Sequence, residues 1–106
     1  MREIKDENLN FFIREVRSKF REKLKRAIFF GSRVRKDFLP ESDYDLLLIF
    51  EEVTPEIKDF ISDLEVRMLL SRGILFSTFI FTPQELEERE FEPFIMNVQK
   101  EGVVID

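Results

Sequence analysis

The chain of 106 residues is 43% apolar and carries a formal net charge of −5, which suits one domain with a modest core filled largely by its 13 phenylalanines. It has no cysteine and no histidine, so disulfides, thiolate or histidine metal sites and histidine-based triads are excluded. The negative charge argues against a general nucleic-acid coat, and apolar runs of about five residues are far shorter than the roughly 20 that cross a bilayer. We therefore expect a single cytoplasmic domain over residues 1–106.

The first predicted element is an amphipathic helix over about Glu7 to Lys25. Its polar residues are most simply a solvated face. A strand over about Arg26 to Phe30 follows, and then a turn at Gly31 leads into a loop that ends at Ser42. The apolar stripe of the helix has spacings of three or four residues and consists of Leu9, Ile13, Val16, Phe20 and Leu24.

A second strand is predicted over about Asp43 to Phe50, and a second helix follows it. Thr54 is a good N-cap with proline at the first helical position after it, and Gly73 ends the helix. A third strand then spans about Ile74 to Phe81. The apolar stripe of the second helix is Ile57, Ile61, Leu64 and Met68.

The last part of the chain alternates helix starts with breaks. Residues 82–85 (Thr-Pro-Gln-Glu) form a capping box that opens a short acidic helix through about Phe91. Pro93 begins a further segment, Gly102 breaks it, and residues 103–105 are the candidate for a short edge strand. The order of elements predicts an α+β or mixed α/β fold, with a small mixed sheet of three to four strands and helices packed on it. In the segment after Pro93, the side chains expected to face inward are Phe94, Ile95 and Val98.

The most informative pattern joins the first two strands. Gly31 and Ser32 follow the first strand, and after ten further residues Asp43 and Asp45 open the second. Alternation along a strand places both aspartates on one face, with Cα atoms roughly 6.5 to 7 Å apart. Two carboxylates this close repel each other, and a divalent cation relieves the repulsion. Because the ligands are oxygens only, Mg²⁺ or Mn²⁺ is expected rather than zinc, with water and phosphate completing the coordination.

The turn has the composition of a phosphate site. Gly31 lets the backbone approach a phosphate closely, and Ser32 adds a hydroxyl and a backbone N–H group. Positive charge beside the turn comes from Arg33, Arg35 and Lys36. These three side chains are phosphate ligands in one interpretation and surface charges paired with acids of the same loop in the other. The whole pattern predicts a site for a metal-bound nucleotide.

This stretch resembles the minimal nucleotidyltransferases of the DNA polymerase beta superfamily. The match is Phe30-Gly31-Ser32-Arg33 and, after the spacer, Ser42-Asp43-Tyr44-Asp45-Leu46. The resemblance implies that the Gly-Ser pair grips the β- and γ-phosphates of a nucleoside triphosphate and that the two aspartates bind the metals. It also implies transfer of a nucleoside monophosphate, most simply AMP from ATP, to a hydroxyl.

One part of the family's pattern is absent. Full catalysts of the superfamily usually carry a third carboxylate on a later strand, often as a base and as a ligand of a second metal. The third predicted strand here contains no acid. Ser77 or Thr78 stands roughly where the acid is expected, and a hydroxyl does not replace its charge.

Some stand-alone members of this family act as antitoxins and modify a HEPN-domain partner with AMP. The present chain resembles them in its motif and, more weakly, in its ending, which contains Phe94, Ile95 and Glu101-Gly102-Val103. Small size and negative charge suit a protein acceptor better than nucleic acid, which is not expected as the main partner.

Three hypotheses remain open on the sequence. The first is a magnesium-dependent nucleotidyltransferase that uses ATP and has a protein acceptor. The second is an inactive nucleotidyltransferase fold that neutralises or scaffolds a HEPN-type partner by contact. The third is a structural domain in which the two aspartates have no catalytic role. The sequence does not name the acceptor or the nucleotide, and it leaves room for a homo-oligomer.

Overall fold

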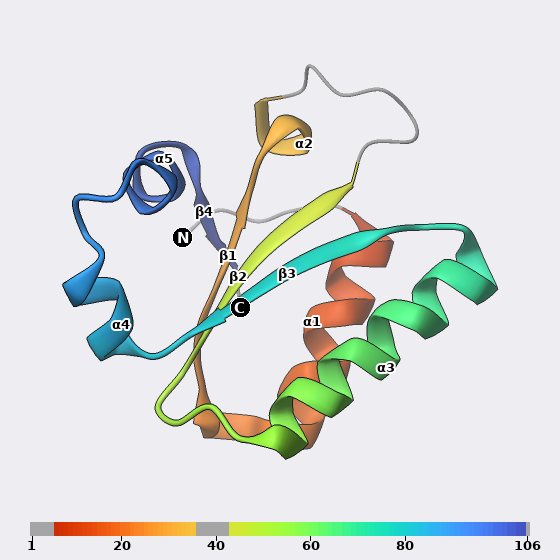
Figure 1. Ribbon diagram of the computed structural model, residues 1–106. Coiled ribbons are helices and arrows are strands. Elements are labelled where there is room, and N and C mark those ends of the chain that lie inside the picture. The colour runs from red at the N-terminus through yellow and green to blue at the C-terminus, as the bar shows by residue number, and fades with distance from the viewer. Residues whose placement is uncertain (1–5, 36–42, 106) are drawn as a thin grey trace.

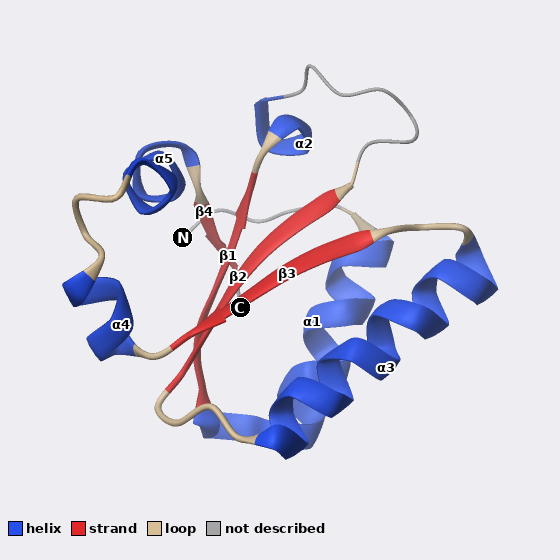
Figure 2. Cartoon of the chain, viewed as in Figure 1, coloured by secondary structure: helices blue, strands red, loops and turns tan. Residues whose placement is uncertain are grey.

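Within residues 6–35 and 43–105, which the computed structural model describes, four strands form one mixed sheet in the order β3-β2-β1-β4. β1 pairs antiparallel with both β2 and β4, whereas β2 and β3 are parallel. The predicted α+β class with a small mixed sheet is confirmed (Figure 2). The strands are β1 (Leu24–Phe30), β2 (Tyr44–Phe50), β3 (Phe76–Phe81) and β4 (Val103–Ile105).

Helices lie on both sides of the sheet (Figure 1). α1 (Glu7–Phe20) and α3 (Pro55–Arg72) cover one face, while α4 (Pro83–Glu88) and α5 (Pro93–Glu101) lie on the other side. The one-turn helix α2 (Ser32–Arg35) lies directly after β1, at the end of the sheet where that strand ends. Among the described residues, no helix is long and apolar enough to cross a membrane.

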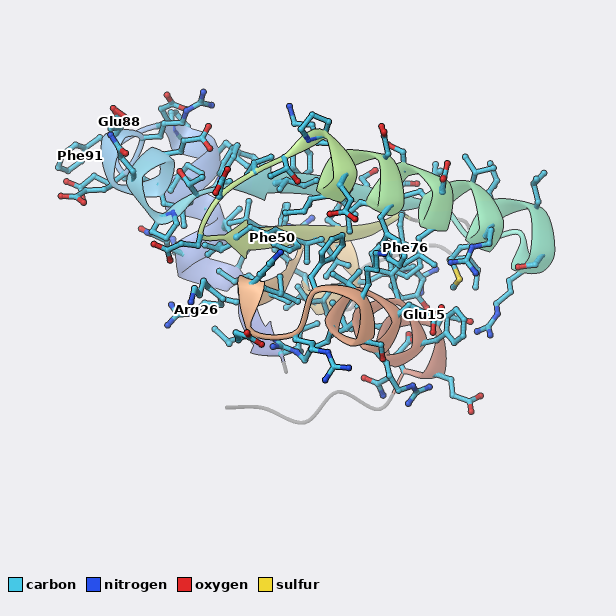
Figure 3. All side chains as sticks on the ribbon, turned by 90° about the horizontal axis from the view of Figure 1, so that it is seen from below. Glu15, Arg26, Phe50, Phe76, Glu88 and Phe91 are labelled. Carbon is cyan, nitrogen blue, oxygen red and sulfur yellow. The ribbon has the colours of Figure 1, made fainter. Side chains whose placement is uncertain are left out.

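The two faces of the sheet bury different amounts of apolar surface. The face under α1 and α3 carries the larger core, in which Phe12 of α1 stacks on Phe76 of β3 with ring centroids 4.2 Å apart. Phe50 and Phe76 point into this layer between the sheet and the helices (Figure 3). The smaller cluster on the other face consists of Ile28, Phe30, Leu47, Ile49 and Val98.

The first helix is shorter than predicted. α1 ends at Phe20 rather than at Lys25, because Arg21 adopts a φ of 52° and a 3₁₀ turn follows over Arg21–Lys23. Leu24 is buried as expected, but it belongs to β1 and pairs with Phe50 in the sheet. The predicted apolar stripe of the helix therefore includes one residue too many, because Leu24 reaches the core from β1.

Other boundaries differ by a few residues. β3 begins at Phe76 rather than Ile74, and α4 ends at Glu88 rather than Phe91. The caps are confirmed: the Thr54 side chain accepts a hydrogen bond from the third residue of α3, and Gly73 ends that helix in a left-handed conformation. The capping box before α4, the inward side of α5 and the edge strand β4 are also confirmed.

Candidate active site

The sheet register brings the two halves of the sequence pattern together. Because β1 and β2 are antiparallel, Phe30 at the end of β1 pairs with Asp45 near the start of β2. The parallel pairing of β2 and β3 then places Ser77 beside Asp45. The Gly31 turn, the second aspartate and the start of β3 therefore meet at the end of the sheet where β1 ends and β2 begins, next to α2 (Figure 1).

Gly31 is required by the closeness of Asp45. Its φ of +89° lies in the left-handed region that favours glycine. A β-carbon built at this position would overlap Asp45 Oδ2 and lie 3.0 Å from Asp45 Cγ. The carbonyl oxygen of Gly31 accepts hydrogen bonds from the N–H groups of Val34 and Arg35, and Ser32 is the first residue of the short helix that these bonds close.

Asp43 and Asp45 are both half-buried, and they act on each other electrostatically. Burial, and then the negative charge of Asp43, raise the pKa of Asp45 above its usual value. The guanidinium of Arg35 lowers that pKa, and the carboxylate of Glu101 raises it. Partial burial and the neighbouring carboxylate thus both disfavour the charged form of Asp45.

The structure decides between the two hydroxyls of β3. Ser77 lies on the face of the aspartates, and its hydroxyl donates a hydrogen bond of 3.0 Å to Asp43 Oδ2. Thr78 points to the opposite face, where its hydroxyl donates to Glu65 Oε2 of α3 at 3.0 Å. Ser77 is therefore the residue that stands where a third carboxylate would face the pair.

The cations predicted beside the turn take different directions. The guanidinium of Arg33 lies 4.1 Å from the ring centroid of Tyr44, whose hydroxyl donates a hydrogen bond of 2.7 Å to Asp6 Oδ2. Arg35 forms an ion pair with Glu101 at the end of α5. Lys36 lies outside the described residues, so its predicted phosphate contact stays a prediction.

The family model described as a nucleotidyltransferase domain matches residues 10–106 of this chain. The chain belongs to the nucleotidyltransferase domain family. It is 30% identical over 94 residues to a candidate protein adenylyltransferase of Methanocaldococcus jannaschii, a match that covers 89% of this chain and 90% of that protein. The prediction of a minimal nucleotidyltransferase, with transferase activity at the level of the family, is thereby confirmed.

Two solved structures share the nucleotidyltransferase fold. One is a candidate nucleotidyltransferase from Sulfolobus solfataricus, with a TM-score of 0.54, 24% identity, and coverage of 91% of this chain and 74% of the other. The second is a toxin–antitoxin structure with AMP-PNP, with a TM-score of 0.59, 14% identity, and coverage of 89% and 69%. At these identities the likeness concerns the fold alone.

The donor set of this nucleotidyltransferase site fits a divalent cation that prefers oxygen ligands. Asp43 and Asp45 offer carboxylate oxygens on one face, and a cation would offset their mutual repulsion, which adds to burial in raising the pKa of Asp45. Among the described residues, no group of three acids, histidines or cysteines is placed to hold a metal. Mg²⁺ is commonly bound by one or two carboxylates, with water and phosphate oxygens as the other ligands, and Asp43 and Asp45 fit that role.

A cavity of about 570 Å³ lies away from the two aspartates, alongside α1 and β4. Three arginines line it together with Ile105 and other residues, and its described lining includes none of the predicted site residues. The candidate active site stays at the carboxylates, where the predicted sequence pattern and the paired acids lie. The three arginines are Arg14, Arg17 and Arg21.

Sequence reasoning did not assign Glu101 to the site. It lies 66 positions after Arg35 in the chain, and only the docking of α5 brings the two together. The signal in the sequence that could have indicated Glu101 was the pair Glu101-Gly102 before the last strand, in the ending that resembles small stand-alone family members. That signal pointed to a family and did not indicate a contact.

Proposed function

We propose that this chain is a magnesium-dependent nucleotidyltransferase that transfers AMP from ATP to a hydroxyl group of a partner protein. The observation that carries the proposal is the convergence of Asp43 and Asp45 beside the Gly31 turn, on one face of the sheet. Family membership supports the reaction class. The oxygen-only donor set supports Mg²⁺ or Mn²⁺ as the ion.

In the proposed reaction, the acceptor oxygen forms a bond to the α-phosphorus while the bond to the leaving pyrophosphate breaks, and the hydroxyl proton is released. Bound Mg²⁺ would supply charge stabilisation at the phosphates. Asp43 and Asp45 would hold the ion, and the hydroxyl of Ser77 would fix the orientation of Asp43. Gly31 would let the carboxylate of Asp45, and with it the bound ion, lie against the turn.

Two findings support a protein acceptor. The M. jannaschii relative, matched over nine-tenths of its length, carries the name of a protein adenylyltransferase. One solved structure with the same fold is a toxin–antitoxin complex with AMP-PNP. A HEPN-domain partner and a cytoplasmic location remain predictions from the sequence. A protein suits the role of acceptor better than nucleic acid does, because the chain is acidic overall.

The second candidate function is a binding module without catalysis. The observation that favours it is Ser77, because a neutral hydroxyl stands on β3 where full catalysts of the superfamily carry an acid. Such a module would still accommodate nucleotide and would act on its partner by contact alone. Binding of ATP therefore does not separate the two functions, whereas transfer does.

The test is transfer of label from α-³²P-ATP, with Mg²⁺, to the partner that co-purifies with the protein. We expect Asp43→Asn and Asp45→Asn each to reduce transfer by about 100-fold or more while the protein stays folded. Asp63→Asn, on the exposed side of α3, is the matched control and should transfer at the wild-type rate. Transfer at the wild-type rate by both site variants would overturn the assignment, and nucleotide binding without transfer by the wild type would favour the binding module.

A further inference from the structure

We propose that copies of this chain associate head to tail, with Phe91 and its neighbouring glutamates on one copy docking into the arginine-lined cavity alongside α1 and β4 of the next copy. The two surfaces are called here the acidic segment, residues 84–92, and the arginine cavity. Neither surface includes Asp43 or Asp45, so the inference does not rest on the proposed reaction.

The arginine cavity concentrates positive charge on a chain that is acidic overall. Its volume of about 570 Å³ lies in the range of about 300–1,000 Å³ that is typical of ligand pockets. The described residues of its lining include three arginines and no acid, while Ile13 and Ile105 add apolar surface. The cavity therefore suits an occupant that combines negative charge with an apolar group. The arginines are Arg14, Arg17 and Arg21.

The arginines come from one side of α1 and from the residue that ends it. Arg14 and Arg17 are one turn apart on the helix, and Arg21 is its C-cap. The Nη1 group of Arg17 donates a hydrogen bond of 3.4 Å to the carbonyl oxygen of Leu24, which holds this side chain beside the start of β1. Glu15 lies on the side of α1 that faces α3, where it forms an ion pair with an arginine of that helix. Its negative charge is thus turned away from the cavity.

The acidic segment has the complementary character. It contains five glutamates and one arginine, and the guanidinium of Arg89 lies 5.2 Å from the ring centroid of Phe81. Phe91 stands among the glutamates and is 82% exposed, although aromatic rings gain most when they are buried. Glu88 and Phe91 lie at one end of the molecule, with their side chains pointing away from it (Figure 3). The exposed glutamates are Glu87, Glu88, Glu90 and Glu92.

A second copy is the occupant because one chain carries both surfaces and holds them apart. The acidic segment follows β3 and includes most of α4, which lies on the opposite side of the sheet from α1 (Figure 1). Between copies, the glutamates would face the arginines, and the ring of Phe91 would leave water for the isoleucines of the cavity. Contact between two different surfaces of the same chain is head to tail.

Nucleic acid is a less suitable occupant of the arginine cavity. Proteins that bind single strands commonly stack the bases on aromatic rings, and the described lining of this cavity includes no aromatic residue. The net charge of −5 also repels a polyanion, whereas it does not prevent local contact between oppositely charged surfaces of two copies.

The experiment is sedimentation velocity of the full chain over a range of protein concentrations at about 50 mM salt. We expect the average mass to rise above that of the monomer with concentration, and to rise less at about 500 mM salt because the charges are screened. Phe91→Ala should weaken the association by about tenfold or more, since a buried aromatic anchor carries much of the energy of an interface.

Two neutralised variants test the two surfaces separately. R14Q/R21Q changes only the cavity, and E88Q/E90Q/F91A changes only the acidic segment; all five positions are exposed, so both variants should fold. Each variant alone should stay monomeric where the wild type associates. An equimolar mixture should form a 1:1 complex that grows no further, because each variant retains one intact surface and the two intact surfaces match.

The matched control is D59R/D63R, which reverses two exposed acids of α3 and should associate as the wild type does. Loss of association in this control would reduce the effect to overall charge and overturn the inference. A mixture of the two neutralised variants that stays monomeric would overturn it as well. So would a wild type that remains monomeric up to about 0.5 mM protein, whether or not its cavity then binds a polyglutamate peptide or an RNA oligonucleotide.

Discussion

The two faces of the sheet are made by the same strands, but one carries the larger core and the other carries the carboxylates of the candidate site. Along β2, Leu46, Leu48 and Phe50 are fully buried beneath α1 and α3. The residues between them point the other way, and the series starts with the half-buried Asp45. The period of two along a strand therefore directs one set of side chains into the larger core and places Asp45, the first member of the other set, at the candidate site.

The opposite face, here called the open face, is buried unevenly. On the central strand β2, Leu47 and Ile49 are buried in the small cluster that also contains Val98 of α5. On the edge strand β3, Phe79 pairs with Leu47 and contacts the rings of Phe30 and Phe94, yet it is still 38% exposed. This face is thus covered less over the edge strand β3 than over β2.

The largest expected difference between the faces is in stability. Leu46→Ala on the covered face should lower the free energy of unfolding by about 2–5 kcal/mol, because it leaves a cavity in a closed core. Phe79→Ala on the open face should cost about 1 kcal/mol or less, although it removes more atoms, because solvent already reaches the ring. Urea unfolding of both variants measures these free energies, and equal losses would contradict the expected difference between the two faces.

A second prediction tests which face can hold a metal. Ser77→Asp places a third carboxylate beside Asp43 and should lower the stability of the metal-free protein by about 1–4 kcal/mol through like-charge repulsion. Mn²⁺ should restore much of this loss by binding the three acids.

The matched control for that variant is Thr78→Asp, which adds the same charge one residue along but on the covered face beside Glu65. It should also melt earlier, and Mn²⁺ should not restore it. Thermal scans in chelator and in Mn²⁺ make the measurement. If Mn²⁺ raised the melting temperature of Thr78→Asp as much as that of Ser77→Asp, the effect of the metal would not depend on the face.

The smallest expected effect concerns Glu65, the carboxyl on the covered face. Burial raises its pKa, and the hydrogen bond from Thr78 offsets only part of that rise. The folded protein therefore carries a penalty for the charged form above the raised pKa, and the penalty disappears as the pH falls through it. We expect Glu65→Gln to raise the melting temperature by a few degrees at about pH 7 and to lose this advantage near about pH 4. A lower melting temperature than the wild type at about pH 7 would contradict the prediction.

Most of the fold and half of the site follow from local sequence patterns. The strands, the caps at Thr54 and Gly73, and the pairing of Asp43 with Asp45 depend on residues close in sequence, where alternation and capping preferences act directly. The end of α1 does not, because the positive φ of Arg21 is imposed by the entry of the chain into β1.

The remaining features of the site depend on pairing between distant segments. Whether Ser77 or Thr78 faces the aspartates is decided by the parallel register of β2 and β3, which no local pattern contains. The approach of Glu101 to Arg35 similarly requires α5 to dock on the sheet. Sequence spacing therefore found the metal-binding candidates, left Ser77 and Thr78 as alternatives, and did not find Glu101.

The separation between Arg35 and Glu101 also bears on the order in which the molecule assembles during folding. The antiparallel neighbours β1 and β2 are close in sequence, so their pairing closes a short loop and brings Gly31 to Asp45 early. Ser77 joins after the 18-residue helix α3 has crossed the sheet. The contact of Arg35 with Glu101 spans 66 positions, and contacts of this separation form late. A refolding chain would thus assemble its acidic groups before the ion pair of its arginine, and the last stage of folding would complete the electrostatic balance of the site.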